Sequence, residues 1–222
     1  MVQPIYSRWL AEPAPIETTV LASPGQVELH LTMRSADADA ARARLAGATA
    51  SLREALGDAV YSTDGRRLPE IVGEALRERS LTIAAAESCT GGMLLERLTS
   101  GPGSSAYVEG GVVAYSNELK VRLLGVDPAL IEAHGAVSEA VAAAMVDGLR
   151  ARTGADVGVA ITGIAGPHGG TPAKPVGTVV IGLAAGTRPL SVRTHLFAGD
   201  REMVRVQAVQ TALDRVRLAL AT

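Results

Sequence analysis

Residues 81–92 read LTIAAAESCTGG, an apolar run that ends in a Glu-Ser-Cys-Thr step and two glycines. Residues 81–86 have the continuous apolar character of a buried strand, and the segment that follows, MLLERL at 93–98, predicts a helix over 91–99. Ser88 is therefore expected where a strand turns into a helix. Free backbone N–H groups and the positive end of the helix dipole would stabilise an anion or an oxyanion beside it. The alternative is that Ser88 or Thr90 simply caps the helix.

On both sides of this stretch, helical and strand-like segments alternate. Helical patterns begin at 68, 117, 128, 139 and 201, and further strands are predicted at 111–115, 157–161, 177–185 and 190–197. This order predicts an α/β fold, a three-layer α/β/α sandwich whose mostly parallel sheet is made mixed by a closing hairpin. Active loops of such sheets lie at the carboxyl ends of strands, so the loops after residues 86, 115 and 161 are expected to gather.

The first 65 residues are predicted to form a separate, smaller appendage. Residues 1–25 contain four prolines and are interpreted as an irregular lead-in. Apolar and polar residues alternate over 26–33 as in a half-buried strand, an Ala-rich helix is expected from about 36 to 56, and residues 60–62 are predicted to return as a second strand. The sequence thus predicts a small β-α-β appendage at 1–65 and a main domain at 66–222.

Composition excludes several classes of protein. Hydrophobic residues make up 47% of the 222 residues and the formal net charge is −2, which argues against binding nucleic acid or a membrane surface through bulk charge. No apolar run reaches the length of a membrane span and no signal peptide is recognisable. One cysteine allows no internal disulfide, and the four histidines lack the spacing of metal ligands. We expect a cytoplasmic protein without a metal or cofactor.

Lys120 is the candidate general base. It is predicted in the first turn of a helix, where the dipole disfavours a cation, and desolvation would further favour the neutral amine that a serine nucleophile requires. Ser–Lys pairs are a known form of activated nucleophile. The alternative is an ordinary solvent-facing lysine.

Two neighbours of this pair remain open to more than one interpretation. Tyr115 ends an apolar strand, where it either packs in the core, relays a proton between Ser88 and Lys120, or stacks on an aromatic ligand. Cys89 is a rival nucleophile at a helix N-terminus, but no Cys-His-Asn spacing supports a thiol enzyme, and a small buried hydrophobe is the favoured interpretation.

The glycine-rich loop TGIAGPHGG at 162–170 matches neither standard phosphate-binding motif. Its glycines would still let the backbone approach a ligand closely. Lys174 is interpreted as a mobile surface lysine. Arg201, in the first turn of the last helix, is either a phosphate ligand or an ordinary surface arginine.

Six motifs in order along the chain resemble the C-terminal domain of the CinA (competence/damage-inducible) family: ESCTGG at 87–92, YSNExK at 115–120, HGAVS at 134–138, TGIAGP at 162–167, KPVGT at 174–178 and GDR at 199–201. The resemblance covers about residues 66–222. It implies a nicotinamide-nucleotide amidase, which converts nicotinamide mononucleotide and water to nicotinic acid mononucleotide and ammonia in pyridine nucleotide salvage. It further implies Ser88 as nucleophile, Lys120 as base and Tyr115 as their partner. Substrate contacts are expected from Thr90, Gly91, Thr162, Gly163, Gly166 and Arg201.

Residues 15–62 look like the small KH-type middle segment of longer family members, but lack the Gly-x-x-Gly loop that clamps RNA, so no RNA binding is expected. The molybdopterin-binding-like domain with which longer members begin is not expected here, nor is its ADP-ribose pyrophosphatase activity. We expect a homo-oligomer, a dimer or higher. The competing interpretation of the whole chain is a catalytically silent nucleotide-sensing or partner-binding module.

Overall fold

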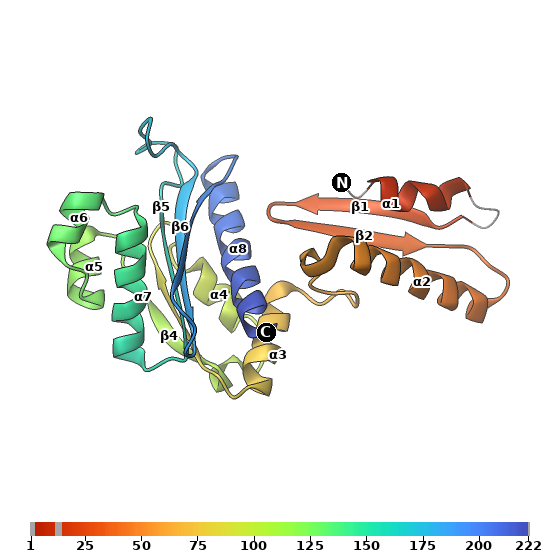
Figure 1. Cartoon of the computed structure of the whole chain (residues 1–222), viewed down its shortest axis with the longest axis horizontal. Helices are drawn as coiled ribbons and strands as arrows, with labels where there is room; N and C mark the ends of the chain where they lie inside the picture. The colour runs from red at the N-terminus through yellow and green to blue at the C-terminus, as the bar shows by residue number, and fades with distance from the viewer. Residues whose placement is uncertain (1–2, 12–14, 222) are drawn as a thin grey trace. The chain divides into compact units, whose positions relative to one another are not determined.

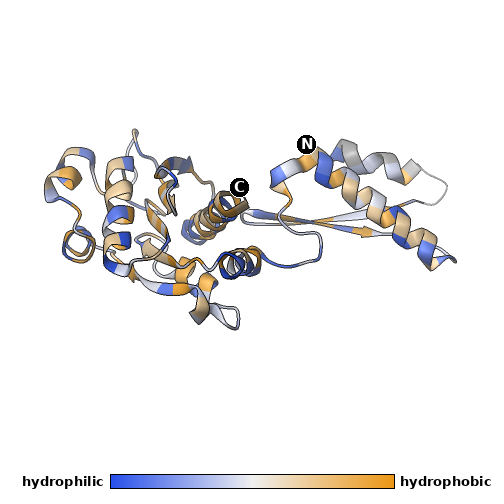
Figure 2. Cartoon of the chain, turned by 60° about the horizontal axis from the view of Figure 1, so that its bottom comes forward, coloured by the Kyte–Doolittle hydropathy of each residue, from blue (hydrophilic) through white to orange (hydrophobic). Residues whose placement is uncertain are grey.

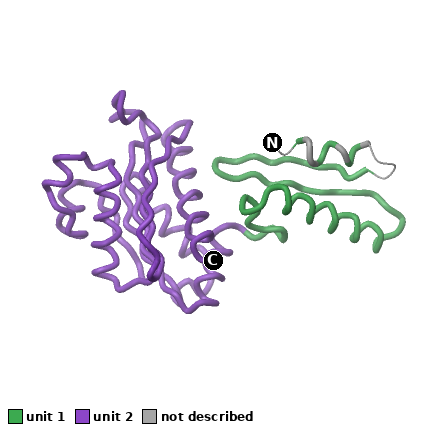
Figure 3. Tube along the Cα trace, viewed as in Figure 1, with its two compact units in different colours: residues 1–66 green, residues 67–222 purple. Residues whose placement is uncertain are grey.

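The computed structural model describes residues 3–11 and 15–221. The chain divides into two compact units, residues 1–66 and 67–222 (Figure 3). Each unit is described by itself. Among the described residues, no helix has the length and apolar character needed to cross a membrane.

The smaller unit is built on a two-stranded hairpin and one long helix. It contains α1 (Gln3–Ser7), β1 (Glu17–Ser23), β2 (Gln26–Thr32) and α2 (Ala38–Leu56). β1 and β2 pair antiparallel and are joined by Pro24-Gly25, where Gly25 takes the positive φ that such a turn requires. In α2 hydrophobic and hydrophilic residues alternate (Figure 2), and Ala48 and Leu52 pack with Trp9 and Ile16.

The β-α-β order predicted for this unit is wrong. β2 and α2 lie where they were expected, but residues 60–62 form no strand, and β1 lies within the stretch interpreted as irregular. The prolines of that stretch led to the irregular interpretation, although Pro15 precedes β1 and Pro24 belongs to its turn. Residues 1–2 and 12–14 of the stretch lie outside the described residues. The 3-10 turn Gly57–Ala59 ends α2 instead of leading into a strand.

The larger unit is an α/β/α sandwich around a five-stranded mixed sheet, which confirms the predicted fold class. The strands are β3 (Ile83–Glu87), β4 (Val108–Val113), β5 (Val157–Gly163), β6 (Thr178–Ala185) and β7 (Ser191–Leu196), in the spatial order β4-β3-β5-β6-β7. β3 pairs parallel with β4 and β5, whereas β6 pairs antiparallel with β5 and β7. Only β6 therefore runs against the other four strands.

Helices cover both faces of this sheet (Figure 1). The helices are α3 (Leu68–Glu78), α4 (Met93–Thr99), α5 (Asn117–Leu124), α6 (Pro128–His134), α7 (Glu139–Thr153) and α8 (Arg201–Ala221). α3, α4 and α8 lie on one side, and α5, α6 and α7 on the other. In β3, Ala84 and Ala86 face the α7 side, so Ala85 and Glu87 point to the α4 side.

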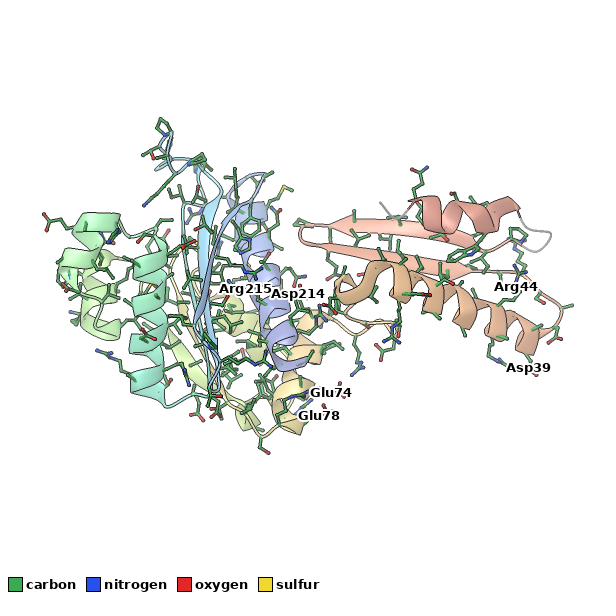
Figure 4. All side chains as sticks on the ribbon, viewed as in Figure 1. Asp39, Arg44, Glu74, Glu78, Asp214 and Arg215 are labelled. Atoms are coloured by element: carbon green, nitrogen blue, oxygen red, sulfur yellow. The ribbon has the colours of Figure 1, made fainter. Side chains whose placement is uncertain are left out.

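Local signals at the helix ends are confirmed. The side chains of Ser116, Asp127 and Ser138 accept backbone N–H groups at the starts of α5, α6 and α7. Asp200 accepts the N–H of Met203 at the start of α8. Within α8, Arg215, labelled in Figure 4, donates to the carbonyl of Ile181 and so ties the helix to β6.

The parallel register brings the predicted loops together. Glu87, the last residue of β3, is level with Val113 of β4 and with Ile161 of β5. The segments that leave β3, β4 and β5 therefore start side by side at one edge of the sheet, as expected from the sequence.

Candidate active site

Ser88 follows β3 directly and begins the turn that leads to α4. Its N–H donates to the carbonyl of Ile161 at 2.9 Å, which extends the pairing with β5 by one residue. The residue is only 7% exposed. The turn then passes through Gly91 and Gly92, both with positive φ, before α4 begins at Met93.

Glu87, not Ser88 or Thr90, caps α4. Its carboxylate accepts the N–H groups of Gly92 at 3.0 Å, Leu94 at 3.1 Å and Leu95 at 2.8 Å. The expectation that the α4 N-terminus would offer its free N–H groups to an anion is therefore wrong, because a side chain of the protein already occupies them. Since Ser88 does not cap the helix either, its hydroxyl is available for another partner.

That partner is Lys120. Its Nζ lies 3.2 Å from Ser88 Oγ, and it also donates to the carbonyl of Ala114 at 3.1 Å and to that of Tyr115 at 3.5 Å. At 2% exposure Lys120 is buried, so the alternative of a solvent-facing lysine is wrong. Burial lowers the pKa of its amine, and the nearby Cys89 opposes that shift only in part.

The thiol of Cys89 is a poor nucleophile in this setting. It is 6% exposed, and burial raises its pKa to about 11. At neutral pH the sulfur is therefore protonated, as expected for a small buried hydrophobe. A side chain at Gly163 would approach Cys89 Sγ to 3.0 Å, so the glycine leaves room for the sulfur.

Tyr115 and Arg201 meet although they are far apart in the sequence. Arg201 Nη2 donates to the Tyr115 hydroxyl at 2.7 Å, and Nη1 donates to the carbonyl of Gly166 at 2.9 Å. Tyr115 is 57% exposed, so its ring is not a core residue. Among the residues that the structure describes, its hydroxyl bonds to neither Ser88 nor Lys120; the carbonyl of Tyr115 is the atom that receives Lys120.

The remaining residues predicted to contact substrate lie near the Ser88 turn, but they are mostly buried or bonded to other groups of the protein. Thr162 is buried, and its hydroxyl donates to the carbonyl of Ala136 at 2.9 Å. Thr90 is fully buried, and its Oγ1 has no partner among the described residues. Gly91, whose φ is positive, would place a side chain against Arg205 at 3.5 Å.

The sequence analysis did not single out two contributors to this region, and it interpreted a third differently. Glu87 is one, and its only signal was a carboxylate in an otherwise apolar strand. Arg205, one turn after Arg201, donates from Nη2 to the carbonyl of Thr90 at 2.8 Å and so holds the far side of the turn. Lys174, predicted to be mobile, instead donates to the carbonyl of His134 at 2.7 Å.

The glycine-rich loop forms an open hollow of about 500 Å³ between residues 167 and 176. Ser88 and Lys120 do not line it. In the described part of the chain, no group of three or more His, Cys, Asp or Glu side chains gathers as a metal site would require.

Comparison with known proteins gives consistent matches over the larger unit. A family model described as the CinA C-terminal domain matches residues 65–220. A CinA-like protein of Koribacter versatilis is 50% identical over 221 residues, which are 99% of this chain and 52% of that protein. The chain spans about half the length of the curated relatives it matches.

Solved structures agree with this match. The competence damage-inducible protein A (ComA) from Klebsiella pneumoniae is similar with a TM-score of 0.67 and 38% identity, over 69% of this chain and 95% of that chain. The competence/damage inducible protein CihA from Agrobacterium tumefaciens has a TM-score of 0.67 and 35% identity, over 73% of this chain and 99% of that chain.

Proposed function

The chain belongs to the CinA family, and from that premise we propose that it is an amidohydrolase that deamidates nicotinamide mononucleotide to nicotinic acid mononucleotide and ammonia. The observation that carries the proposal is the buried contact between Lys120 Nζ and Ser88 Oγ at 3.2 Å. Among the described residues Lys120 Nζ bonds to two carbonyls and the Ser88 hydroxyl but to no carboxylate, an environment suited to a base for a serine nucleophile.

The first step is attack by Ser88 on the carboxamide carbon. Burial lowers the pKa of Lys120, which favours the neutral amine able to accept the hydroxyl proton. As Oγ forms its bond to carbon, that proton passes to Nζ and the carbonyl oxygen of the substrate becomes an oxyanion. The carbonyls of Ala114 and Tyr115 then stabilise the ammonium form of Lys120.

Two backbone N–H groups without an oxygen acceptor in the described part of the chain are proposed as donors to the oxyanion, and that of Cys89 lies near its own thiol. In the Ser88 turn, Gly91 donates to Ser88 and Met93 donates to Thr90, while Glu87 takes the amides further along. Among the described residues, no oxygen accepts from the N–H groups of Cys89 or Thr90, which directly follow the nucleophile. The N–H of the residue after a nucleophile is a common oxyanion donor. In other enzymes one such donor stabilises the transition state by about 3 kcal/mol, so two donors contribute several kcal/mol.

The intermediate then collapses with loss of ammonia. The Lys120 ammonium returns its proton to the departing nitrogen, the C–N bond breaks, and an ester with Ser88 remains. A water molecule, deprotonated by the regenerated neutral amine, attacks that ester and releases the carboxylate product. The serine recovers its proton from Lys120, which closes the cycle.

The rest of the substrate would be bound at the surface above this pair. Tyr115 presents an exposed ring, suited to stack on the pyridine ring, and its hydroxyl is held by Arg201. Arg201 begins α8, and its guanidinium would donate to the 5′-phosphate. Such a reaction belongs to pyridine nucleotide salvage in the cytoplasm.

The proposal is tested by ammonia release from nicotinamide mononucleotide. We expect release by the unaltered chain and a loss on the order of a thousandfold or more in Ser88→Ala and in Lys120→Ala, because the two residues act as a unit. Cys89→Ala is the matched control and is expected to remain active. Full activity in Ser88→Ala would refute the acyl-enzyme route.

The competing function is a silent module that binds the nucleotide without turnover. Calorimetric titration of the unaltered chain with nicotinamide mononucleotide, run beside the ammonia assay, separates the two. Binding without ammonia would assign a sensing role, whereas binding with release supports the amidase.

A further inference from the structure

Glu87 is a buried charged group that the proposed reaction does not use. It is 0% exposed and directly precedes Ser88. Among the described residues, its carboxylate accepts the N–H groups of Gly92, Leu94 and Leu95. Capping a seven-residue helix does not by itself explain why a carboxylate is buried beside the nucleophile.

Stability alone is a weak reason. Burying a carboxylate costs a large part of its hydration energy, and its hydrogen bonds offset that cost only when the geometry is good. α5, α6 and α7 are capped by a serine or aspartate immediately before the first turn, and in α3 the carboxylate of Glu70, inside the first turn, accepts the N–H of Arg67. The α4 cap comes instead from a residue that precedes a five-residue turn, so the cap fixes the whole turn and not only the helix end.

The main chain of Glu87 reaches the base as well. Its carbonyl accepts the N–H of Ala114 at 2.8 Å, and the carbonyl of Ala114 accepts Lys120 Nζ at 3.1 Å. The next residue, Ser88, is fixed to Ile161 through its own N–H. Glu87 thus lies at the junction of α4, the nucleophile turn and the segment that holds Lys120.

The carboxylate also determines which amides of the turn stay open. By accepting three N–H groups beyond Gly91, it draws the start of α4 toward the end of β3. The turn between them is then closed by its own bonds from Gly91 and Met93, which leaves the N–H groups of Cys89 and Thr90 without an oxygen acceptor in the described residues.

We propose that Glu87 is a positioning residue: its carboxylate clamps α4 so that Ser88 Oγ stays within reach of Lys120 and the two following N–H groups stay open for the oxyanion. This inference rests on the proposed function. It concerns the transition state and not substrate binding, so it predicts a change in kcat with little change in KM.

The test compares two isosteric substitutions at opposite ends of the β3–β5 pair. Glu87→Gln removes the charge and turns an amide N–H toward backbone N–H groups. Asp156→Asn is the matched control, because Asp156 accepts the N–H of Thr82 at 2.9 Å at the opposite end of β3. Both variants are expected to melt at a lower temperature. Only Glu87→Gln is expected to lose kcat, by about tenfold to a hundredfold, with KM within about twofold.

Equal kcat values for the two folded variants would overturn the inference. Glu87→Asp provides a second measure, since it keeps the charge but shortens the side chain, and its kcat is expected between those of the unaltered chain and Glu87→Gln. If Glu87→Gln does not fold, the Asp variant decides: an unchanged kcat overturns the inference. If neither variant folds, Glu87 serves the core and the inference also fails.

Failure of the proposed function is recognised separately, as absence of ammonia release by the unaltered chain. Glu87 is then judged by the rate at which diisopropyl fluorophosphate phosphorylates Ser88, measured by intact mass. In this reaction Oγ bonds to phosphorus, fluoride leaves and Lys120 takes the proton. Slower labelling in Glu87→Gln than in Asp156→Asn supports the inference. Equal rates, or no labelling of the unaltered chain, overturn it.

Discussion

The environment of Lys120 is the feature at the residue scale from which most consequences follow. In the part of the chain that the structure describes, the partners of Lys120 Nζ are carbonyls and a hydroxyl. They compensate a buried ammonium poorly, so the neutral amine gains relative stability. The same geometry that lowers the pKa also aims the nitrogen at Ser88. The burial of Lys120 therefore sets both the pKa of its amine and the position of its nitrogen beside Ser88.

The activity should follow the titration of Lys120. Because the amine must be neutral to act, kcat/KM is expected to rise with pH, along a limb whose apparent pKa lies below the ordinary 10.5 of lysine. Ammonia release measured from neutral to alkaline pH tests this. Lys120→Arg, which stays charged throughout, is the control and is expected to be inactive at every pH. A limb at or above the ordinary value would contradict the assignment.

Cys89 should behave as a buried thiol beside the site. With a pKa raised to about 11 by burial, it is expected to react slowly with iodoacetamide at neutral pH. Cys89→Ala is expected to keep ammonia release within about threefold, because the sulfur takes no part in the chemistry. Fast alkylation that abolishes turnover, together with an inactive Cys89→Ala, would make the thiol part of the mechanism.

At the scale of elements, the packing of α5 on α7 places the base. A side chain at Gly148 of α7 would come within 1.6 Å of the carbonyl of Leu124, the last residue of α5. This close approach requires glycine and brings α5, which carries Lys120, against α7.

Gly148→Ala is therefore expected to lower both stability and activity. Overpacking of this kind costs about 1–3 kcal/mol, and α5 must shift to relieve it. Gly47→Ala is the matched control, since Gly47 lies inside α2 with nothing within 4 Å, and the change should stabilise the smaller unit by about 0.5–1 kcal/mol. Urea unfolding and ammonia release measure both. An active, fully stable Gly148→Ala would contradict the packing argument.

Most elements were predictable because their signals are local. Capping residues predicted the starts of three helices correctly: Ser116 for α5, Asp127 for α6 and Ser138 for α7. The apolar runs predicted the strands of the sheet. β1 was missed because a mostly exposed strand has no apolar alternation; it exists through its pairing with β2.

At the scale of the whole molecule, every residue of the candidate site belongs to residues 67–222. The Klebsiella pneumoniae structure matches 69% of this chain and 95% of its own, and the family model matches residues 65–220, which favours a larger unit that folds independently. We expect residues 67–222, produced alone, to retain kcat. A folded but inactive fragment would assign the smaller unit a role in catalysis. The predicted homo-oligomer stays a prediction, to be tested by sedimentation.

The sequence by itself determined the fold class, the edge of the sheet at which the loops meet, and the serine and lysine to examine, because periodicity, caps and strand order are local properties of the chain. Only the tertiary structure decided that Glu87 occupies the α4 N-terminus, that Lys120 is buried on Ser88, and that Tyr115 is held by Arg201. These facts depend on which segments approach one another and which side chains lose water. The spacing of residues along one helix or strand predicts neither the approach of distant segments nor the burial of particular side chains.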